Sequence, residues 1–312
     1  MSLLCDELIA RGHEVTLFAT GDSKTDAQLR SYFEHGYEHD EELWDWQFTE
    51  YMHVGHAYSQ AGEFDLIHCH SYHFGVPFAQ FVTTANVHTH HVEMEPGVID
   101  AYRRLPQVQL VAVSRFQSQA YGGCPNLELI PHGIETDAFP FGEQGGDYLL
   151  FLGRMIRDKG PVEAIEIARQ ADMPLVLAGP AEDGFDERVS CEIDERRIRY
   201  LGRVEPPERD RLLAGAAALV YPLLYPEPFG LVPIEAMACG TPVLGVGIGA
   251  VPELIEPGLT GYLADSWEGL AGLVPRALEL DRRAIRDRAR ERFDYTRMVD
   301  AHEALYQRLV GR

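Results

Sequence analysis

The sequence predicts an α/β protein with two domains, each a parallel sheet covered by helices on both faces. Short apolar runs alternate with helical segments along the whole chain, and this alternation is typical of parallel sheets that are buried on both sides. The chain has 312 residues, more than a single hydrophobic core usually holds. We therefore expect two cores, and a hydrophobic content of 46% is ample for both.

The first half of the chain supplies the first sheet. Five strand-like runs cover residues 14–20, 64–70, 86–90, 109–114 and 127–132. Helical segments separate these runs, and the longest of them spans residues 41–61. This order predicts parallel strands joined by helices.

The beginning of the chain is unusual for such a domain. Residues 2–11 are predicted to form a helix that ends at Gly12, and the run at residues 14–20 follows directly. A doubly wound domain normally has a strand and a turn before this helix, and that strand lies centrally in the sheet. We therefore expect that the first domain lacks its first strand. Either a coding segment lies upstream of Met1, or the protein binds its ligand through the second domain and has little activity.

The second half supplies the second sheet. Its strand-like runs cover residues 147–153, 174–179, 198–202, 217–222 and 241–247. Turn-forming residues concentrate at residues 131–146, which predicts the join between the domains. We expect a first domain at residues 1–136, a second at residues 137–293, and a final amphipathic helix at residues 294–312.

The stretch at residues 225–240, YPEPFGLVPIEAMACG, contains a loop that leads into a helix. Pro226 and Pro228 disfavour helix around Glu227. Gly230 allows the backbone to approach a ligand closely. The free amides at the start of the following helix suit an anion. This junction is therefore a candidate binding site.

Two glutamates flank the junction. The amphipathic run after Leu231 predicts a helix that ends at Gly240 and carries Glu235. At a rotation of about 100° per residue, Glu235 lies roughly 80° from the line of Glu227, so both could border one pocket. Amides would then bind phosphate, and carboxylates would bind vicinal hydroxyls. The alternative is an acidic helix start favoured by the helix dipole, with Glu235 in solvent.

A second motif lies upstream at residues 149–168, LLFLGRMIRDKGPVEAIEIA. An apolar run ends at Gly153, Arg154 follows at once, and Lys159 comes shortly before Pro161, which suits the first position of a helix. In open parallel sheets, ligands bind outside the carboxyl ends of the strands. Two cations at such an end match a diphosphate.

The use of basic residues strengthens this assignment. Of the 27 Lys and Arg residues, only Lys24 and Lys159 are lysines. An arginine offers a planar fork to phosphate oxygens, while a lysine offers a compact, mobile charge. The pair could therefore divide phosphate binding from neutralisation of a leaving group. The alternative for Lys159 is a surface ion pair with Asp158.

Together these motifs resemble those of the retaining glycosyltransferases of family 4. The resemblance rests on the two glutamates of EPFGLVPIE, the following AMACGTPV, and the GR-x4-KG pattern. It extends over nearly the whole chain, through ELIARGHEVTLFATGDS, FDLIHCHS, IPHGIETDAF and FDYTRMVDAHEALYQRLV. It implies the GT-B fold, in which two Rossmann-like domains face a cleft, with the final helix packed back on the first domain.

The resemblance also implies roles for single residues. Arg154 and Lys159 would hold the donor diphosphate, and Glu235 would bind the ribose hydroxyls. Glu227 would face the transferred sugar, and His88 would reach the reaction centre from the first domain. The backbone would add substrate contacts at Gly153, Phe229, Gly230 and Leu231.

The histidines of the first half leave another possibility open. They fall near the ends of two predicted strands: His68, His70, His73, His88, His90 and His91. His68 and His70 share one strand face, and so do His88 and His90, so a zinc site is conceivable. No helical H-x-x-x-H or carboxylate spacing accompanies them, and enzymes of the GT-B fold generally need no metal for chemistry. We therefore expect no metal, and histidines that hydrogen-bond sugar or backbone groups, with His88 catalytic.

Composition excludes several other classes. A net charge of −22 argues against nucleic acid and against electrostatic docking on anionic lipid. Apolar stretches are broken by proline well short of a membrane span, and no signal-peptide pattern opens the chain. The five cysteines are odd in number and form no C-x-x-C, which indicates reduced thiols and a cytoplasmic location.

The sequence therefore predicts a cytoplasmic enzyme that moves a sugar from a nucleoside diphosphate sugar, of the UDP or GDP type, to an unidentified acceptor. Retention of configuration follows from the resemblance, and no cofactor is expected. One alternative is a nucleotide-sugar-binding protein with little transfer activity. Another is an epimerase or phosphorylase of the same fold.

Overall fold

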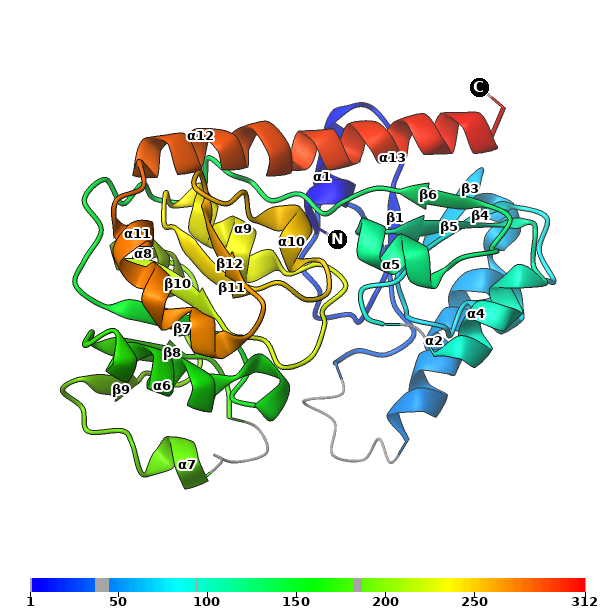
Figure 1. Cartoon of the computed structure of the whole chain (residues 1–312). Helices are drawn as coiled ribbons and strands as arrows, with labels where there is room; N and C mark the ends of the chain where they lie inside the picture. Colours follow the sequence, from blue (N-terminus) through cyan, green and yellow to red (C-terminus); the bar gives the residue numbers. More distant parts are fainter. Residues whose placement is uncertain (1, 37–44, 94, 182–186, 312) are drawn as a thin grey trace. The chain divides into compact units, whose positions relative to one another are not determined.

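The computed structural model describes residues 2–36, 45–93, 95–181 and 187–311. The chain forms two compact units (Figure 1). The first is Met1–Gly133 together with Tyr295–Arg312, and the second is Ile134–Asp294. Each unit has its own parallel sheet with helices packed on it, so the predicted α/β class with parallel sheets is confirmed.

The sheet of the second unit has six parallel strands. In chain order they are β7 (Leu149–Leu152), β8 (Leu175–Ala178), β9 (Ile198–Tyr200), β10 (Ala218–Tyr221), β11 (Val243–Val246) and β12 (Gly261–Ala264). Their order in space is β9-β8-β7-β10-β11-β12. This is the 3-2-1-4-5-6 order of doubly wound sheets, which bind ligands where the strand order reverses. Here the reversal lies between β7 and β10.

Helices cover both faces of this sheet. They are α6 (Pro161–Gln170), α7 (Glu187–Ser190), α8 (Glu208–Gly215), α9 (Leu231–Ala238), α10 (Val251–Leu254), α11 (Val274–Leu278) and α12 (Arg282–Phe293). Because strand side chains alternate between faces, Ala218 and Val220 pack into one core with α6 and α11. Tyr221 lies on the other face, beside the start of α9.

The sheet of the first unit has four parallel strands in sequential order. They are β3 (Leu66–Cys69), β4 (Ala85–Thr89), β5 (Val108–Ala112) and β6 (Leu127–Leu129). The helices are α1 (Ser2–Ala10), α2 (Trp46–Ser59), α3 (Val76–Ala79), α4 (Pro96–Arg103), α5 (Arg115–Ala120) and α13 (Tyr295–Leu309). Residues 41–44 of the helix expected at 41–61 lie outside the described residues. The run expected to reach residue 132 stops at Leu129, because Pro131 has no N–H to donate.

Two short strands lie apart from this sheet. β1 (Thr16–Phe18) pairs in parallel with β2 (Gln28–Arg30), which the sequence analysis did not predict. β3 is an edge strand, and within the described ranges no strand pairs with its outer side. β1 and β3 therefore share no neighbouring strand among the residues that the structure describes.

The final helix belongs to the first unit. Leu305 of α13 packs on Val87 and Val111, which face the same side of the sheet. Val299 packs on Leu4 and Leu8 of α1. The opposite side of the sheet packs against α2, α3 and α4, and against Tyr121 just after α5. Both sides of this sheet are therefore covered.

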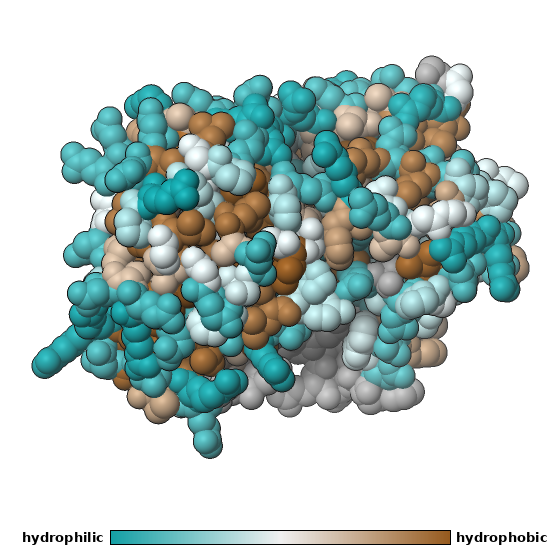
Figure 2. All heavy atoms as spheres, viewed as in Figure 1, coloured by the Kyte–Doolittle hydropathy of each residue, from teal (hydrophilic) through white to brown (hydrophobic). Residues whose placement is uncertain are grey.

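The surface is strongly polar. Figure 2 shows hydrophilic residues over much of the face in view, in keeping with the net charge of −22. Among the described residues, no helix has both the length and the apolar character needed to cross a bilayer.

Candidate functional site

The loops after β7 and β10 meet at the point where the strand order reverses. The N–H of Leu224 donates to the carbonyl of Asp158 at 2.9 Å, which joins the two loops. Gly160 has a φ of +74°, and a Cβ there would collide with the carbonyl oxygen of Pro222. Only glycine therefore fits this close approach without strain. Pro161 follows as the first residue of α6, as predicted.

At this junction the predicted lysine contacts the first of the two predicted glutamates. Lys159 forms an ion pair with Oε1 of Glu227. The hydroxyl of Tyr221, at the end of β10, donates to Oε2 of the same carboxylate. The side chains of Lys159 and Glu227 are 22% and 17% exposed, so the pair is mostly shielded from water. The alternative of a surface ion pair between Lys159 and Asp158 is not what the structure shows.

The surroundings of Lys159 change its pKa. Burial and the nearby guanidinium of Arg154 lower the pKa of Lys159 to about 8. Arg154 itself is exposed and forms no hydrogen bond or ion pair with any residue that the structure describes. Two cations therefore lie at the carboxyl end of β7. One is paired with a carboxylate, and the other is open to an anion from solvent.

Helix α9 begins beside this group. Gly230, the residue before the helix, has a φ of +106°, which strains any other residue. Phe229 is buried and Leu231 is exposed, so the chain passes from the core to the surface at this point. The first-turn amides have no partner within the helix, although Pro233 removes one of them. The N-terminus of α9 therefore adds donors for an anion next to Glu227.

Glu235 lies in different surroundings from Glu227. Its carboxylate contacts Arg209 of α8 at 3.5 Å, and the side chain is 13% exposed. Burial raises the pKa of Glu235, and the Arg209 guanidinium acts in the opposite direction. No hydrogen bond or ion pair joins the two glutamates in the part of the chain that the structure describes. The alternative considered above, in which Glu235 lies in solvent, does not agree with this partly buried position.

Gly153 connects β7 to the neighbouring strand. Its N–H donates to the carbonyl of Ala178, at the end of β8, at 3.0 Å. Arg154 therefore leaves the sheet immediately after a fixed backbone position.

The structure corrects the expected position of His88. We expected it at a strand end facing a ligand, but it lies within β4 with no exposed surface. Nε2 contacts the hydroxyl of Tyr58 at 2.8 Å, and Nδ1 contacts the hydroxyl of Tyr102 at 2.6 Å. Burial lowers its pKa to about 3. Its catalytic role stays a prediction, which this core environment does not favour.

The neighbouring histidines form a row at the carboxyl edge of the same sheet. His91, just beyond β4, is exposed. Its Nε2 lies 2.9 Å from Nδ1 of His70, and its Nδ1 lies 3.2 Å from Nε2 of His132. The ring centroids are 5.2 and 5.0 Å apart with nearly parallel planes. The three rings are therefore joined through their nitrogens.

A signal for this row was present in the sequence. His70 and His132 end predicted strand-like runs, and His91 directly follows one. The ends of parallel strands lie at one edge of a sheet. The sequence analysis gave His91 only a secondary place and did not consider His132. No group of three or more metal-ligating side chains in the described ranges is arranged to hold an ion.

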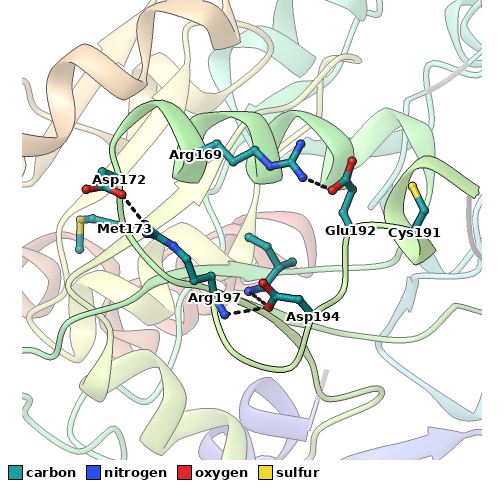
Figure 3. Close-up of a pocket in the computed structure, with 8 residues that line it drawn as sticks. Arg169, Asp172, Met173, Cys191, Glu192, Asp194 and Arg197 are labelled. Carbon is teal, nitrogen blue, oxygen red and sulfur yellow. Dashed lines mark hydrogen bonds and ion pairs between the residues drawn. The ribbon is translucent and has the colours of Figure 1, made fainter.

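One cavity lies elsewhere in the second unit. It has a volume of about 370 Å³ and is lined by Arg169, Asp172, Met173, Cys191, Glu192, Asp194, Arg197 and Ile198. Figure 3 shows that its arginines are already paired, Arg169 with Glu192 and Arg197 with Asp172. Met173 and Ile198 lie at the amino ends of β8 and β9, the edge opposite the candidate site. We therefore assign this cavity no ligand.

Comparison with known families matches both halves of the chain. Residues 134–292 match the family described as glycosyl transferases group 1. Residues 2–138 match the family described as glycosyltransferase family 4. The first match includes the loops after β7 and β10 and both glutamates.

Curated relatives match at about 30% identity. The chain is 31% identical to a D-inositol 3-phosphate glycosyltransferase of Mycobacterium avium, over 59% of this chain and 50% of the relative. It is 30% identical to a glycogen synthase of Mycobacterium tuberculosis, over 59% and 49%. The chain thus spans about half the length of the curated relatives it matches.

Solved structures extend the likeness to nearly the whole chain. A sucrose-phosphate synthase from Thermosynechococcus elongatus superposes with a TM-score of 0.79 at 21% identity, covering 99% of this chain and 92% of the other. Anabaena HepE in complex with UDP superposes with a TM-score of 0.73 at 18% identity, covering 97% and 95%. At these identities the likeness concerns the fold.

Proposed function

Since the chain belongs to the glycosyl transferases group 1 family, we propose that it transfers a sugar from a nucleoside diphosphate sugar to an acceptor. The observation that carries this proposal is the contact of Lys159 with Glu227, beside the open guanidinium of Arg154, where the strand order reverses. A diphosphate needs fixed cations, and a sugar needs hydrogen-bond acceptors such as a carboxylate. This contact supplies both from two neighbouring loops.

We propose the following division of roles. Arg154, Lys159 and the first-turn amides of α9 stabilise the negative charge that accumulates on the departing diphosphate. Glu227 binds the transferred sugar, and Glu235, held by Arg209, binds the ribose. The backbone at Gly153, Phe229, Gly230 and Leu231 completes the donor site.

The donor and the stereochemistry are also proposals. One structural neighbour, HepE, was solved with UDP-glucose and with UDP, which supports a UDP sugar as the first donor to test, with a GDP sugar as the alternative. We propose retention of configuration, no metal requirement and a cytoplasmic location. The five cysteines are free thiols, in keeping with a reducing compartment.

The first unit is proposed to bind the acceptor. His91 supports this role better than His88, because His91 is exposed at the carboxyl edge of the sheet while His88 is enclosed in the core. No acceptor is assigned, although one relative is named for inositol 3-phosphate.

A ligand panel tests the proposal. UDP, GDP, ADP and their sugars are compared by thermal shift, since a ligand at about 100 times its Kd adds roughly 2.7 kcal/mol of stability. The preferred donor is then incubated with and without acceptors, and with inorganic phosphate, and the products are identified. A stabilising nucleotide sugar that is never consumed would favour a binding protein. Consumption with phosphate alone would favour a phosphorylase, and a new sugar nucleotide would favour an epimerase.

A further inference from the structure

Tyr221 is the third group in contact around Glu227. It is the last residue of β10, and only 6% of it is exposed. Its hydroxyl donates to Oε2 of Glu227 while Lys159 contacts Oε1. The two oxygens of one carboxylate are therefore held by different donors, one neutral and one cationic.

The chemistry of the phenol fixes its role in this contact. Burial raises the pKa of Tyr221 above its ordinary value, so the hydroxyl keeps its proton at neutral pH. Toward an ionised carboxylate the hydroxyl can only donate. A hydrogen bond to the charged form stabilises that form, so Tyr221 favours an ionised Glu227.

Space for this hydroxyl comes from the residue before α9. A Cβ at Gly230 would lie 3.2 Å from the hydroxyl oxygen of Tyr221 and 3.7 Å from Oε2 of Glu227. The phenol thus fills the gap between the carboxylate and the turn into the helix. It limits rotation of the carboxylate on the side away from Lys159.

We propose that Tyr221 is a positioning residue, whose hydroxyl holds Glu227 ionised and oriented so that the oxygen beside Lys159 is presented to the donor sugar. The identity of the ligand as a sugar rests on the proposed function, whereas the effect of Tyr221 on Glu227 does not. Tyr221 acts through Glu227 and does not itself contact the nucleotide. Loss of its hydroxyl should therefore affect sugar transfer and leave nucleotide binding intact.

The test uses two matched variants of the full chain. Tyr221→Phe removes the hydroxyl and keeps the ring. Tyr148→Phe makes the same change at another partly buried tyrosine of this unit, whose hydroxyl donates to the carbonyl of Leu212 at 2.9 Å, away from the site. Affinity for UDP, kcat and KM for UDP-glucose, and the melting temperature are measured for both.

Tyr221→Phe should lower kcat by roughly 10- to 100-fold, the range expected for a hydrogen bond to a charged group. UDP affinity should stay within about two-fold, since the phosphate contacts are untouched. The acid limb of the kcat profile should move up by roughly one to two pH units, because Glu227 protonates more easily without its donor. In a Glu227→Gln background the same change should add little. Tyr148→Phe should leave kcat unchanged.

A spectroscopic measurement separates this inference from the proposed function. The carboxyl carbon of Glu227 is labelled with ¹³C-glutamate, assigned by its loss in Glu227→Gln, and titrated in wild type and Tyr221→Phe. An upward shift in the variant supports the inference even if no donor is turned over, in which case the proposed function alone fails. An unchanged titration overturns the inference, and so does a loss of kcat that Tyr148→Phe reproduces.

Discussion

Raising the pH from 7 to 9.5 should weaken the binding of a nucleoside diphosphate, because Lys159 loses its proton in this range. Burial and Arg154 lower the pKa of Lys159 from 10.5 to about 8. At pH 7 the amine is therefore about nine-tenths protonated, and at pH 9.5 it is mostly neutral. An anionic ligand favours the charged form, so its affinity should fall as this charge is lost.

The size of the effect follows from linkage. A bound diphosphate raises the pKa of Lys159, since an opposite charge favours the cation. Between the pKa of the free protein, about 8, and the higher value in the complex, affinity should fall by up to about tenfold per pH unit. The terminal phosphate already carries its second charge above pH 7, because its second pKa is about 6, so the ligand itself does not change.

The lowered pKa of Lys159 also changes how the free energy of unfolding depends on pH. The folded pKa lies below the unfolded value of 10.5, so Lys159 is protonated in both states below pH 8 and burial of its charge is unfavourable there. Between pH 8 and 10.5 the unfolded chain binds more protons, so this group contributes stability that rises with pH, by about 3 kcal/mol in total. The effect of Lys159 on stability therefore cannot be the cause of weaker ligand binding above pH 8.

Calorimetry of UDP binding from pH 6.5 to 9.5 measures the effect, with Lys159→Arg as the matched control. Arginine keeps its charge throughout this range, so the variant should show a flat profile above pH 7 even if its affinity is lower. Equal pH dependence in wild type and variant would refute the assignment of the titration to Lys159. A flat wild-type profile would refute the lowered pKa itself.

Four further variants test the three remaining assignments. Arg154→Ala should lower donor turnover by roughly 100-fold without changing Tm, because the side chain is exposed; near-normal turnover would argue against the diphosphate site. Glu235→Ala should weaken UDP and UDP-sugar alike, by about 1.5 to 3 kcal/mol in calorimetry, and equal affinities would exclude the ribose role. His88→Ala should destabilise the fold by about 2 to 4 kcal/mol in denaturant melts, since it leaves a cavity and removes a hydrogen-bond partner from two tyrosine hydroxyls. His91→Ala should keep Tm and lower transfer, and the reverse pattern for the two histidines would contradict their assignment.

The local elements could largely be predicted from the sequence. Each of the ten strand-like runs overlaps a strand in the structure. Helix ends followed the expected signals, with Pro161 at the start of α6 and Gly240, at a φ of +80°, just after α9. These features depend on short-range preferences of proline, glycine and alternating apolar residues, which are written in a few neighbouring positions. The strands β2 and β12 were not predicted.

The residue types of the candidate site could also be predicted from the sequence, because glycine, proline and a rare lysine mark the two loops. The contact between residues of the two loops could not be predicted. Lys159 and Glu227 are 68 positions apart, and the strand order that brings β7 beside β10 places them in contact. Tyr221 ends an apolar strand and has no sequence pattern that separates it from a core residue. Only the close approach of Gly230 and Glu227 shows what its hydroxyl does.

The histidines show the same division most clearly. The sequence by itself determined that His88 and His91 lie at or near one strand end of a parallel α/β domain. Tertiary structure decided which of them is enclosed, because burial depends on the helices that pack over β4 and supply Tyr58 and Tyr102. Strand and helix preferences act over a few residues and can be read along the chain. The protonation, pairing and exposure of a side chain depend on groups that only the folded sheet brings together.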